Sequence, residues 1–311
     1  MEENLTLALK YRPKTLDEVV GNQQIVEVLR KQLSGRSSQP LSHSILLYGP
    51  TGCGKTTLAR IIARELGVQD DDMKEIDSAD FRGIDTIREI RKQCQYKPLN
   101  SPYRVWILDE VHQLTKDAQS ALLKTLEDTP KHVYFILCTT DPQKLLPTIR
   151  GRCSQFQVQP LTDKEMKRLL LRVVKAEGGS LDKGVYEQII QDSMGHPRNA
   201  LQILAQVLSV EPEKRLEVAK RAAETRSQTI ELCRALVNRA SWKKITEILK
   251  GLKDEDAEQI RRAVLGYCQS ILLSGKQDNR VAAIMEEFME PFYNSGFPAL
   301  VLACYSVLFG E

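Results

Sequence analysis

The chain has 311 residues, of which 42% are hydrophobic and 27% charged, a balance typical of a globular protein with about two or three domains. A net charge of +3 does not by itself indicate a nucleic-acid partner, so any basic surface for DNA has to be local. Because no apolar run approaches the roughly 20 residues of a membrane span and the acidic start lacks a signal-peptide pattern, we expect a cytoplasmic protein without a membrane partner.

The first 40 residues are expected to lead into the fold. Thr15–Glu18 has the pattern of a helix capping box, with a threonine followed three residues later by a glutamate. A helix-like apolar stripe follows it, formed by Val19, Val20, Ile25, Val26 and Leu29. Residues 34–40 then read as a loop.

Strand and helix patterns alternate through the next 120 residues. Apolar runs predict strands at 45–48, 73–76, 104–108, 133–138 and 156–158, and amphipathic patterns predict helices at 57–66, 84–94 and 116–127. Such alternation indicates a parallel sheet covered by helices on both faces. Ligands of these sheets bind at the carboxyl ends of the strands.

After Pro160 the pattern becomes helical. Thr162–Glu165 is a second capping box. Apolar stripes continue at Leu201, Leu204 and Leu208, at Trp242, Ile245, Leu249 and Leu252, and at Ile260, Val264, Tyr267 and Ile271. We predict three domains: residues 1–160, 161–212 and 213–311.

A complete phosphate-binding loop follows the first predicted strand. Its glycines expose backbone N–H groups that can surround phosphate oxygens, and Lys55 adds a positive charge. Thr56 can bind Mg²⁺. The predicted nucleotide-binding residues of this loop are Gly49, Pro50, Thr51, Gly52, Cys53, Gly54, Lys55, Thr56 and Thr57.

Two acidic residues follow the apolar run Val105–Leu108 and supply the carboxylates that the phosphate-binding loop lacks. Asp109 can complete the Mg²⁺ shell, and Glu110 is placed to polarise an attacking water. His112 has no metal-ligand spacing with the other histidines, and the seven cysteines form no CxxC pair. We therefore expect ATP and Mg²⁺ but no zinc, and scattered thiols fit a reducing cytoplasm.

Several further motifs occur in a fixed order along the chain. Asp109–His112, Leu122–Glu127 and Thr139–Leu145 resemble segments of the bacterial gamma/tau subunit of DNA polymerase III, whereas Thr115–Gln119 is closer to the small subunits of replication factor C. Over residues 5–210 the chain therefore resembles a clamp-loader ATPase of the AAA+ superfamily. The family opening, its Ser-Arg-Cys motif and its Gly-x-x-Arg-x-Ala-Leu motif correspond to Lys10–Gly21, Arg150–Cys153 and Gly195–Leu201.

The resemblance implies an α/β fold: an AAA+ RecA-like parallel sheet with helices on both faces, a small helical lid and an all-helical C-terminal collar for oligomerisation. It further implies a Mg²⁺-dependent ATPase that is stimulated by DNA and clamp. Such subunits form a pentameric ring, here several copies of this chain with at least one different subunit. The ring opens a sliding clamp and places it on primer–template DNA.

Family motifs also imply roles for individual residues. Thr140 corresponds to the first sensor of the γ-phosphate, Arg152 to an arginine finger that acts on a neighbouring subunit's ATP, and Arg198 to the second sensor. Tyr11, Arg12 and Pro13 would lie beside the adenine. The ordinary alternatives are surface arginines and, at Thr139 and Thr140, a helix cap.

Three departures limit the match. The four cysteines of the bacterial zinc module are missing, Gly151 replaces the serine of Ser-Arg-Cys, and no long C-terminal extension is present. We expect a compact loader subunit, as in a phage or a reduced system. A phage protein would act in the host cytoplasm.

The segment after residue 80 predicts two binding surfaces, one basic and one apolar. Arg82, Arg88, Arg91 and Lys92 form a basic face that we predict to contact DNA phosphates, although a solvated basic face is the commoner use of such residues. Tyr96, Pro98 and Leu99 form an apolar patch that we predict to face the clamp, although they could equally anchor a loop.

Other functions remain open at this point. A non-catalytic scaffold subunit of a loader, a protein-remodelling AAA+ machine and a branch-migration ATPase share parts of the pattern. Phe81-Arg82-Gly83 lies where unfoldases carry an aromatic–apolar–glycine pore loop, but its charged centre suits DNA better than a peptide. Measurable ATP hydrolysis would separate a motor from a scaffold.

Overall fold

The computed structural model describes residues 6–78, 80–253, 255–273, 279–292 and 295–310. It divides into two compact units, one through Glu213 and one from Lys214. The division into three domains, with a further boundary near residue 160, stays a prediction.

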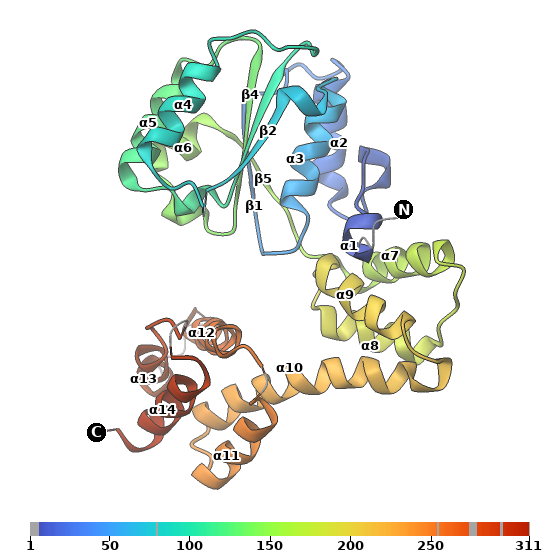
Figure 1. The fold of residues 1–311 in the computed structure, drawn as a ribbon, viewed down its shortest axis with the longest axis vertical. Helices are drawn as coiled ribbons and strands as arrows, with labels where there is room; N and C mark the ends of the chain where they lie inside the picture. The colour runs from blue at the N-terminus through green and yellow to red at the C-terminus, as the bar shows by residue number, and fades with distance from the viewer. Residues whose placement is uncertain (1–5, 79, 254, 274–278, 293–294, 311) are drawn as a thin grey trace. The chain divides into compact units, whose positions relative to one another are not determined.

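A five-stranded parallel sheet forms the centre of the first unit (Figure 1). The strand order is β2-β3-β4-β1-β5, so the chain crosses over the sheet between successive strands. Each predicted strand is confirmed, with ends displaced by at most two residues. The strands are β1 (Ser44–Tyr48), β2 (Met73–Asp77), β3 (Arg104–Asp109), β4 (Val133–Thr139) and β5 (Ser154–Gln157).

Helices cover both faces of this sheet, as the alternating pattern predicts (Figure 1). On one face α2 (Gln23–Leu33) and α3 (Lys55–Glu65) pack on strand residues such as Leu47 and Ile107. On the other face α4 (Ile84–Gln93), α5 (Lys116–Glu127) and α6 (Pro147–Arg152) pack on alternate strand residues such as Leu46 and Leu108. Side chains of successive strand residues point to opposite faces, so near-continuous apolar runs supply both cores.

The prediction for residues 15–29 is wrong in part. Thr15 makes no side-chain cap bond, and Leu16–Glu18 is a short 3₁₀ helix. The α-helix starts only at Gln23, because Gly21 (φ +76°) and Asn22 (φ +53°) turn the chain through left-handed conformations. A Cβ atom at Gly21 would lie 2.3 Å from the Leu161 side chain, so this turn is also a close packing point.

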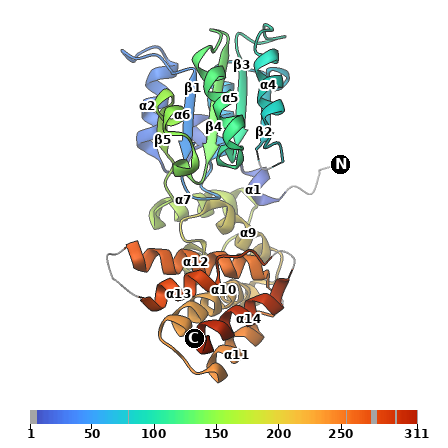
Figure 2. The same ribbon diagram turned by 90° about the vertical axis from the view of Figure 1, so that its left-hand side faces the viewer.

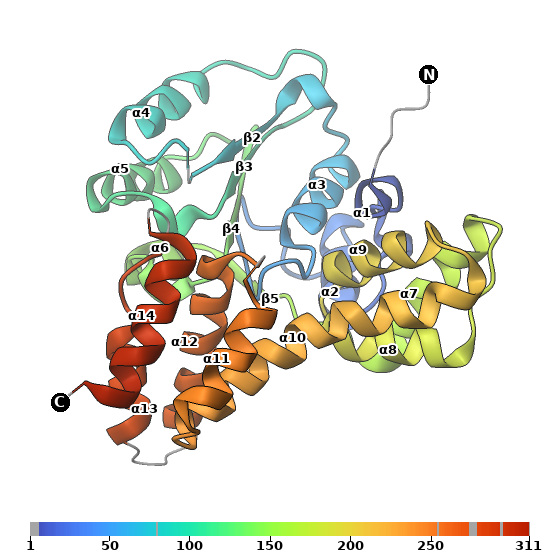
Figure 3. The same ribbon diagram turned by 60° about the horizontal axis from the view of Figure 1, so that its bottom comes forward.

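Three helices complete the first unit and pack on one another: α7 (Asp163–Ala176), α8 (Lys183–Ser193) and α9 (Pro197–Leu208) (Figure 3). The capping box at Thr162 and Glu165 is confirmed, with both reciprocal hydrogen bonds formed. The short helix α1 (Leu7–Lys10) packs on α9, which ties the N-terminal segment to these helices. Further 3₁₀ turns are Asp70–Asp72, Val111–Gln113, Pro142–Lys144 and Pro212–Lys214.

The second unit is helical (Figure 2), as predicted. Its core contains the buried residues Ile245, Val264 and Leu300, the last of which belongs to the C-terminal helix. Among the residues that the structure describes, no helix is long and apolar enough to cross a membrane. The helices are α10 (Arg215–Val237), α11 (Trp242–Gly251), α12 (Ala257–Leu273), α13 (Asn279–Glu287) and α14 (Gly296–Phe309).

Candidate nucleotide-binding site

The carboxyl ends of β1, β3 and β4 meet at one edge of the sheet. The phosphate loop leaves β1 after Tyr48, Asp109 is the last residue of β3, and Thr139 is the last residue of β4. Because β4 pairs in parallel with both β1 and β3, these ends lie side by side. The predicted phosphate, metal and sensor residues therefore come from neighbouring loops.

Steric limits shape the phosphate loop. Gly49 has φ +147°, and a Cβ atom there would lie 2.1 Å from the Val158 carbonyl oxygen, so no side chain fits. The loop passes directly into α3, whose first residue is Lys55. The buried Lys55 Nζ donates to the carbonyl oxygens of Gly49 and Pro50, both at 3.0 Å. The ammonium group is thus held against the loop at the N-terminus of a helix, where anions bind.

Thr56 and Asp109 are in direct contact, although 53 positions separate them in the chain. The Thr56 hydroxyl donates to Asp109 Oδ2 at 2.6 Å, and the Glu110 N–H donates to Asp109 Oδ1 at 3.0 Å. Hydroxyl and carboxylate oxygens are the hard donors that Mg²⁺ prefers. The pair therefore fits a Mg²⁺ ion. Among the described residues there is no cluster of three or more histidine, cysteine, aspartate or glutamate side chains that could hold a metal.

Glu110 lies in a strained turn between β3 and a 3₁₀ helix. Its φ of +46° is in the left-handed region, which costs a non-glycine residue about 1–2 kcal/mol. The Thr140 hydroxyl donates to Glu110 Oε2 at 3.1 Å. The predicted base and the predicted first sensor are therefore hydrogen-bonded to each other.

A cavity of about 690 Å³ borders these residues. The N-terminal segment, the phosphate loop and the helices α7 and α9 contribute to its lining, so it lies between the sheet and the helices that follow it. The predicted residues that line it are Tyr11, Arg12, Pro13, Thr51, Gly52, Cys53, Gly54, Lys55, Thr56, Thr57, Asp109, Glu110 and Arg198. A cavity of this size with a few polar groups is typical of a small-ligand site.

The basic side chains of Arg12, Lys55 and Arg198 line this cavity. Burial lowers the pKa of Arg12 most, and the guanidinium groups of Arg60 and Arg198 lower it further, whereas the Glu75 carboxylate, which is paired with Arg60, raises it. Like charges this close repel one another unless an anion joins them. The arrangement therefore favours a polyanion such as the phosphates of a nucleotide.

The lid helices touch the phosphate loop directly. Pro197 starts α9, as predicted, and Arg198 lies so close to Gly52 that a Cβ atom on the glycine would be 3.5 Å from the arginine Cβ. His196 Nδ1 lies 2.7 Å from the Thr51 carbonyl oxygen and 3.5 Å from Cys53 Sγ. The sequence patterns assign no role to His196. The one indication of a role is that it lies two positions before the predicted sensor Arg198.

The N-terminal segment is fastened to the end of α7. Tyr11 donates its hydroxyl to Glu177 Oε1 at 2.5 Å, and Lys10 forms an ion pair with the same carboxylate at 2.8 Å. This hydrogen bond, followed by burial, raises the pKa of Tyr11. The aromatic side chain therefore lines the cavity from a fixed position.

Arg152 is outside the cavity. It is the last residue of α6, half-exposed, and its guanidinium group forms an ion pair with Glu127 at the end of α5. Arg150, two residues earlier, donates to Gln143. Arg152 therefore does not belong to the residues that line the cavity of its own chain.

The predicted DNA-contacting residues lie along and before α4. Ile87, Ile90 and Cys94 bury one stripe of this segment, whereas the four basic side chains are exposed. Arg88 forms an ion pair with Asp85 at 3.0 Å, and Arg91 forms one with Asp128 at 3.1 Å. The four residues are Arg82, Arg88, Arg91 and Lys92.

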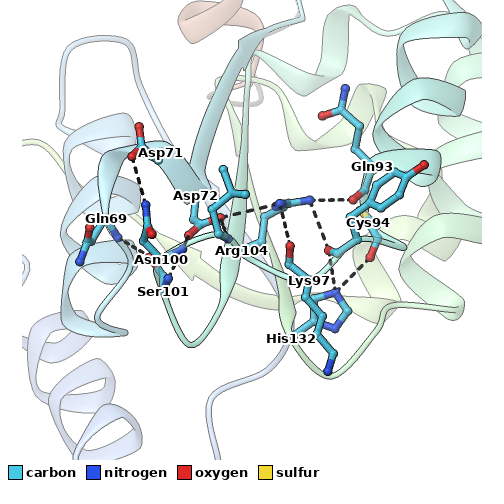
Figure 4. Close-up of polar contacts among 12 residues, drawn as sticks. Gln69, Asp71, Asp72, Gln93, Cys94, Lys97, Asn100, Ser101, Arg104 and His132 are labelled. Carbon is cyan, nitrogen blue, oxygen red and sulfur yellow. Dashed lines mark hydrogen bonds and ion pairs between the residues drawn. The ribbon is translucent and has the colours of Figure 1, made fainter.

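The predicted clamp-facing residues lie on a loop between α4 and β3. Tyr96 is 60% and Leu99 75% exposed, and Pro98 is half-buried. Two buried charged side chains, Asp72 and Arg104, form hydrogen bonds with the backbone of this loop (Figure 4). Asp72 accepts N–H hydrogen bonds from Leu99, Asn100 and Ser101, at 2.7–3.0 Å.

Arg104 binds the other half of this loop. Its guanidinium group donates to the carbonyl oxygens of Gln93, Tyr96 and Lys97 at 2.7–3.3 Å and lies 3.7 Å from the Asp72 carboxylate (Figure 4). His132 Nε2 lies 3.1 Å from the carbonyl oxygen of Cys94. The sequence pattern did not reveal this network, because its members are separated by up to 60 positions in the chain.

A phosphate loop after β1 with acidic residues at the end of the nearby strand β3 is the arrangement typical of nucleotide-binding domains built on a parallel sheet. The Holliday junction branch migration motor RuvB of Thermotoga maritima has the same fold, with a TM-score of 0.61 and 23% identity over 73% of this chain and 79% of that chain. A family profile described as the delta subunit of DNA polymerase III matches residues 71–162, and one described as magnesium chelatase subunit ChlI matches residues 15–108.

Over about two thirds of its length the chain is similar in sequence to gamma and tau subunits of DNA polymerase III. It is 38% identical to the gamma/tau subunit of Mycobacterium tuberculosis strain H37Rv over 229 residues, which cover 66% of this chain and 39% of the relative. It is 34% identical to the tau subunit of Escherichia coli over 65% of this chain and 34% of the relative. The gamma subunit of Buchnera aphidicola from Acyrthosiphon pisum is 32% identical, with 62% of its length covered. The chain thus spans about two fifths of the length of its mycobacterial relatives.

Proposed function

We propose that this chain is an ATPase subunit of a sliding-clamp loader, which uses ATP to open a clamp and place it on primer–template DNA. One observation carries the proposal: Lys55, Thr56, Asp109 and Glu110 meet beside one cavity, in a chain related to the gamma/tau subunit. A scaffold subunit has no chemical need for all four. The resemblance to RuvB supports the shared fold alone.

The cavity would hold ATP with its phosphates on the loop and its adenine near Tyr11, Arg12 and Pro13. Lys55 would exchange its carbonyl partners for phosphate oxygens, since an ammonium group has three donors to redistribute. Arg198 would meet the phosphates from the lid, in the same subunit.

Thr56 and Asp109 would hold Mg²⁺, because their oxygens already meet at 2.6 Å. When bound, the ion neutralises charge on the phosphate oxygens. The protein residues around it supply position: the Asp109 carboxylate is fixed by the N–H of the next residue as well as by the threonine hydroxyl.

Hydrolysis would use Glu110 as the base. Its carboxylate orients a water and takes up a proton as the water oxygen forms a bond to the γ-phosphorus; the bond from that phosphorus to the bridging oxygen breaks, leaving ADP and phosphate. Thr140 would sense the γ-phosphate, and Arg152 of a neighbouring subunit would meet the developing negative charge. Such a finger typically raises turnover by about 10³- to 10⁵-fold.

If Arg152 acts as a finger, the nucleotide that it reaches belongs to a neighbouring subunit, because Arg152 does not line the cavity of its own chain. We propose a pentameric ring of several copies of this chain with at least one different subunit, joined in part through the helical unit after residue 213. Such a protein would work in the cytoplasm. Primer–template DNA would pass the basic face of α4, and the clamp would bind at Tyr96, Pro98 and Leu99.

Two measurements test the proposal together. ATP hydrolysis by the full chain, with its loader partners, should rise strongly when primed DNA and a clamp are both added. Glu110→Gln should bind ATP, DNA and clamp but lose turnover by about 10²- to 10⁴-fold, the usual contribution of a positioned base. Absence of any hydrolysis would indicate a scaffold, and normal turnover of Glu110→Gln would remove the assigned base.

A further inference from the structure

His112 makes buried polar contacts beside the proposed base that the mechanism above does not use. Its side chain is only 8% exposed. Nδ1 lies 3.2 Å from Glu110 Oε2 and 3.0 Å from Thr139 Oγ1. Thr139 is the last residue of β4, so this imidazole bridges the turn after β3 and the end of the neighbouring strand.

The neighbours of His112 determine which ring nitrogen carries hydrogen. Gln113 Nε2, which can only donate, lies 3.0 Å from His112 Nε2, so this ring nitrogen accepts. Burial lowers the pKa of His112 and favours the neutral imidazole. The remaining hydrogen is then on Nδ1, which is within hydrogen-bond distance of Thr139 Oγ1 at 3.0 Å and has Glu110 Oε2 beside it at 3.2 Å. A carboxylate can only accept, so both sides of the ring require the same tautomer.

We infer that His112 is a positioning residue for Glu110: its Nδ1–H, together with the Thr140 hydroxyl, fixes Oε2 and leaves Oε1 for the attacking water. This inference rests on the proposed function of Glu110. The residues that the structure describes form no hydrogen bond with Oε1, whereas Oε2 has two neighbouring donors. A carboxylate held by one oxygen presents the other in a defined direction.

Backbone geometry explains why such a device is needed. Glu110 is in the left-handed region and its N–H is committed to Asp109 Oδ1, so the side chain leaves the turn in a direction set by that bond. Two routes connect this carboxylate to the end of β4. The Thr140 hydroxyl donates to it directly, and His112, which lies beside it, also contacts the Thr139 hydroxyl. Movement of this strand end on nucleotide binding would therefore reach the base through two contacts at once.

A merely structural role would give a different signature. If His112 only filled space, its replacement would lower stability and leave the turnover of the folded protein unchanged. If it positions Glu110, the turnover number falls while the affinity for ATP stays the same, because binding needs the loop and lid rather than the base. Groups that orient a reacting residue typically contribute about 10- to 100-fold to activity.

The test compares three replacements in the full chain under the conditions of the stimulated ATPase assay. His112→Leu removes both nitrogens and should lower single-turnover hydrolysis by about 10- to 100-fold with unchanged ATP affinity. His112→Asn carries an amide near the position of Nδ1 and should recover most of the rate. His112→Gln places its amide nearer Nε2 and should recover less. Asn and Gln variants of equal rate would overturn the inference even if the leucine variant did not fold.

A double-mutant cycle with Glu110→Gln separates this inference from the proposed function. With the carboxylate already replaced, His112→Leu should cause no further loss, since it acts through that group. A full additional loss in the Glu110→Gln background, or wild-type turnover of His112→Leu beside an inactive Glu110→Gln, would overturn the positioning role alone. Wild-type turnover of Glu110→Gln would overturn the base itself.

Discussion

Replacing Asp72 by alanine should loosen the exposed loop between α4 and β3. The Asp72 carboxylate is fully buried and accepts three backbone N–H bonds from that loop. Burial opposes its ionisation, but the N–H groups of Asn100 and Leu99 and the groups of Ser101 outweigh this, so the pKa of Asp72 is lowered. The ionised carboxylate is thus a net support of the fold at neutral pH.

The expected cost follows from two contributions. Hydrogen bonds to a charged group contribute about 1.5–3 kcal/mol each, and removing one partner of a buried ion pair costs about 3–5 kcal/mol. The two contributions overlap and are not summed. The ion pair is long, with 3.7 Å between Arg104 and the Asp72 carboxylate, and Arg104 keeps its three carbonyl partners when the carboxylate is removed. We therefore expect a loss of about 3–5 kcal/mol, a large part of the 5–15 kcal/mol of a typical domain.

Hydrogen exchange and urea unfolding measure this directly. The amides of Leu99, Asn100 and Ser101 should exchange at least about 100-fold faster in Asp72→Ala, since every 1.4 kcal/mol is tenfold. Asp71→Ala is the matched control: Asp71 is exposed and its carboxylate lies 3.5 Å from the Asn100 side chain. Equal exchange in the two variants, with the same urea midpoint, would show that the buried carboxylate does not hold the loop.

Three further predictions concern other parts of the chain. Arg152→Ala should bind ATP normally but lose at least about 10³-fold of DNA-stimulated hydrolysis in the assembled ring, and full turnover would exclude a finger. Removing both Arg82 and Arg88 should reduce the slope of log affinity against log salt by about 1.8 for two duplex phosphates, whereas the exposed Lys164→Ala should leave it unchanged; an unaltered slope in the double variant would count against DNA contact. Hydrogen bonds from Arg261, and then from the Phe292 N–H and Arg262, outweigh burial and lower the pKa of Glu258 to about 2, below the value near 4.3 of an unfolded chain. Its contribution is therefore complete above about pH 4.3 and lost as pH falls toward 2, so Glu258→Gln should flatten the acid limb of unfolding of the second unit, and an acid limb identical to that of the wild type would contradict this.

Most of the fold follows from local patterns in the sequence. Strand residues such as Leu46 and Leu47 are both buried because helices cover both faces, and an uninterrupted apolar run signals that arrangement. The start of α2 was missed although the sequence carries a local signal for it, because glycine and asparagine, the residues at 21 and 22, favour the left-handed turn found there. The close approach of the Leu161 side chain to Gly21 is a long-range contact that local patterns do not give.

In the candidate site, contacts between residues of known motifs could be predicted, whereas other contacts between distant residues could not. The contact of Thr56 with Asp109 was predictable, because each belongs to a motif whose ligand chemistry requires the other. His112 was considered only as a metal ligand, and its actual partner Thr139 is 27 positions away. Its packing against the end of β4 depends on the strand order, which single-sequence patterns do not give.

Strand β3 connects the two ends of the proposed machine. Arg104, its first residue, binds the loop that carries Tyr96, and Asp109, its last, contacts Thr56 at the nucleotide site. The five intervals between its six residues, at about 3.3 Å each, separate these ends by about 17 Å. Residues 104–108 are buried, and residues 105–108 are paired on both sides with β2 and β4, so the strand has no room to bend or slide independently. If the loop docks a clamp while the site holds ATP, a change at one end must therefore reach the other as a rigid displacement of the sheet domain against neighbouring subunits, rather than through local rearrangement along the strand.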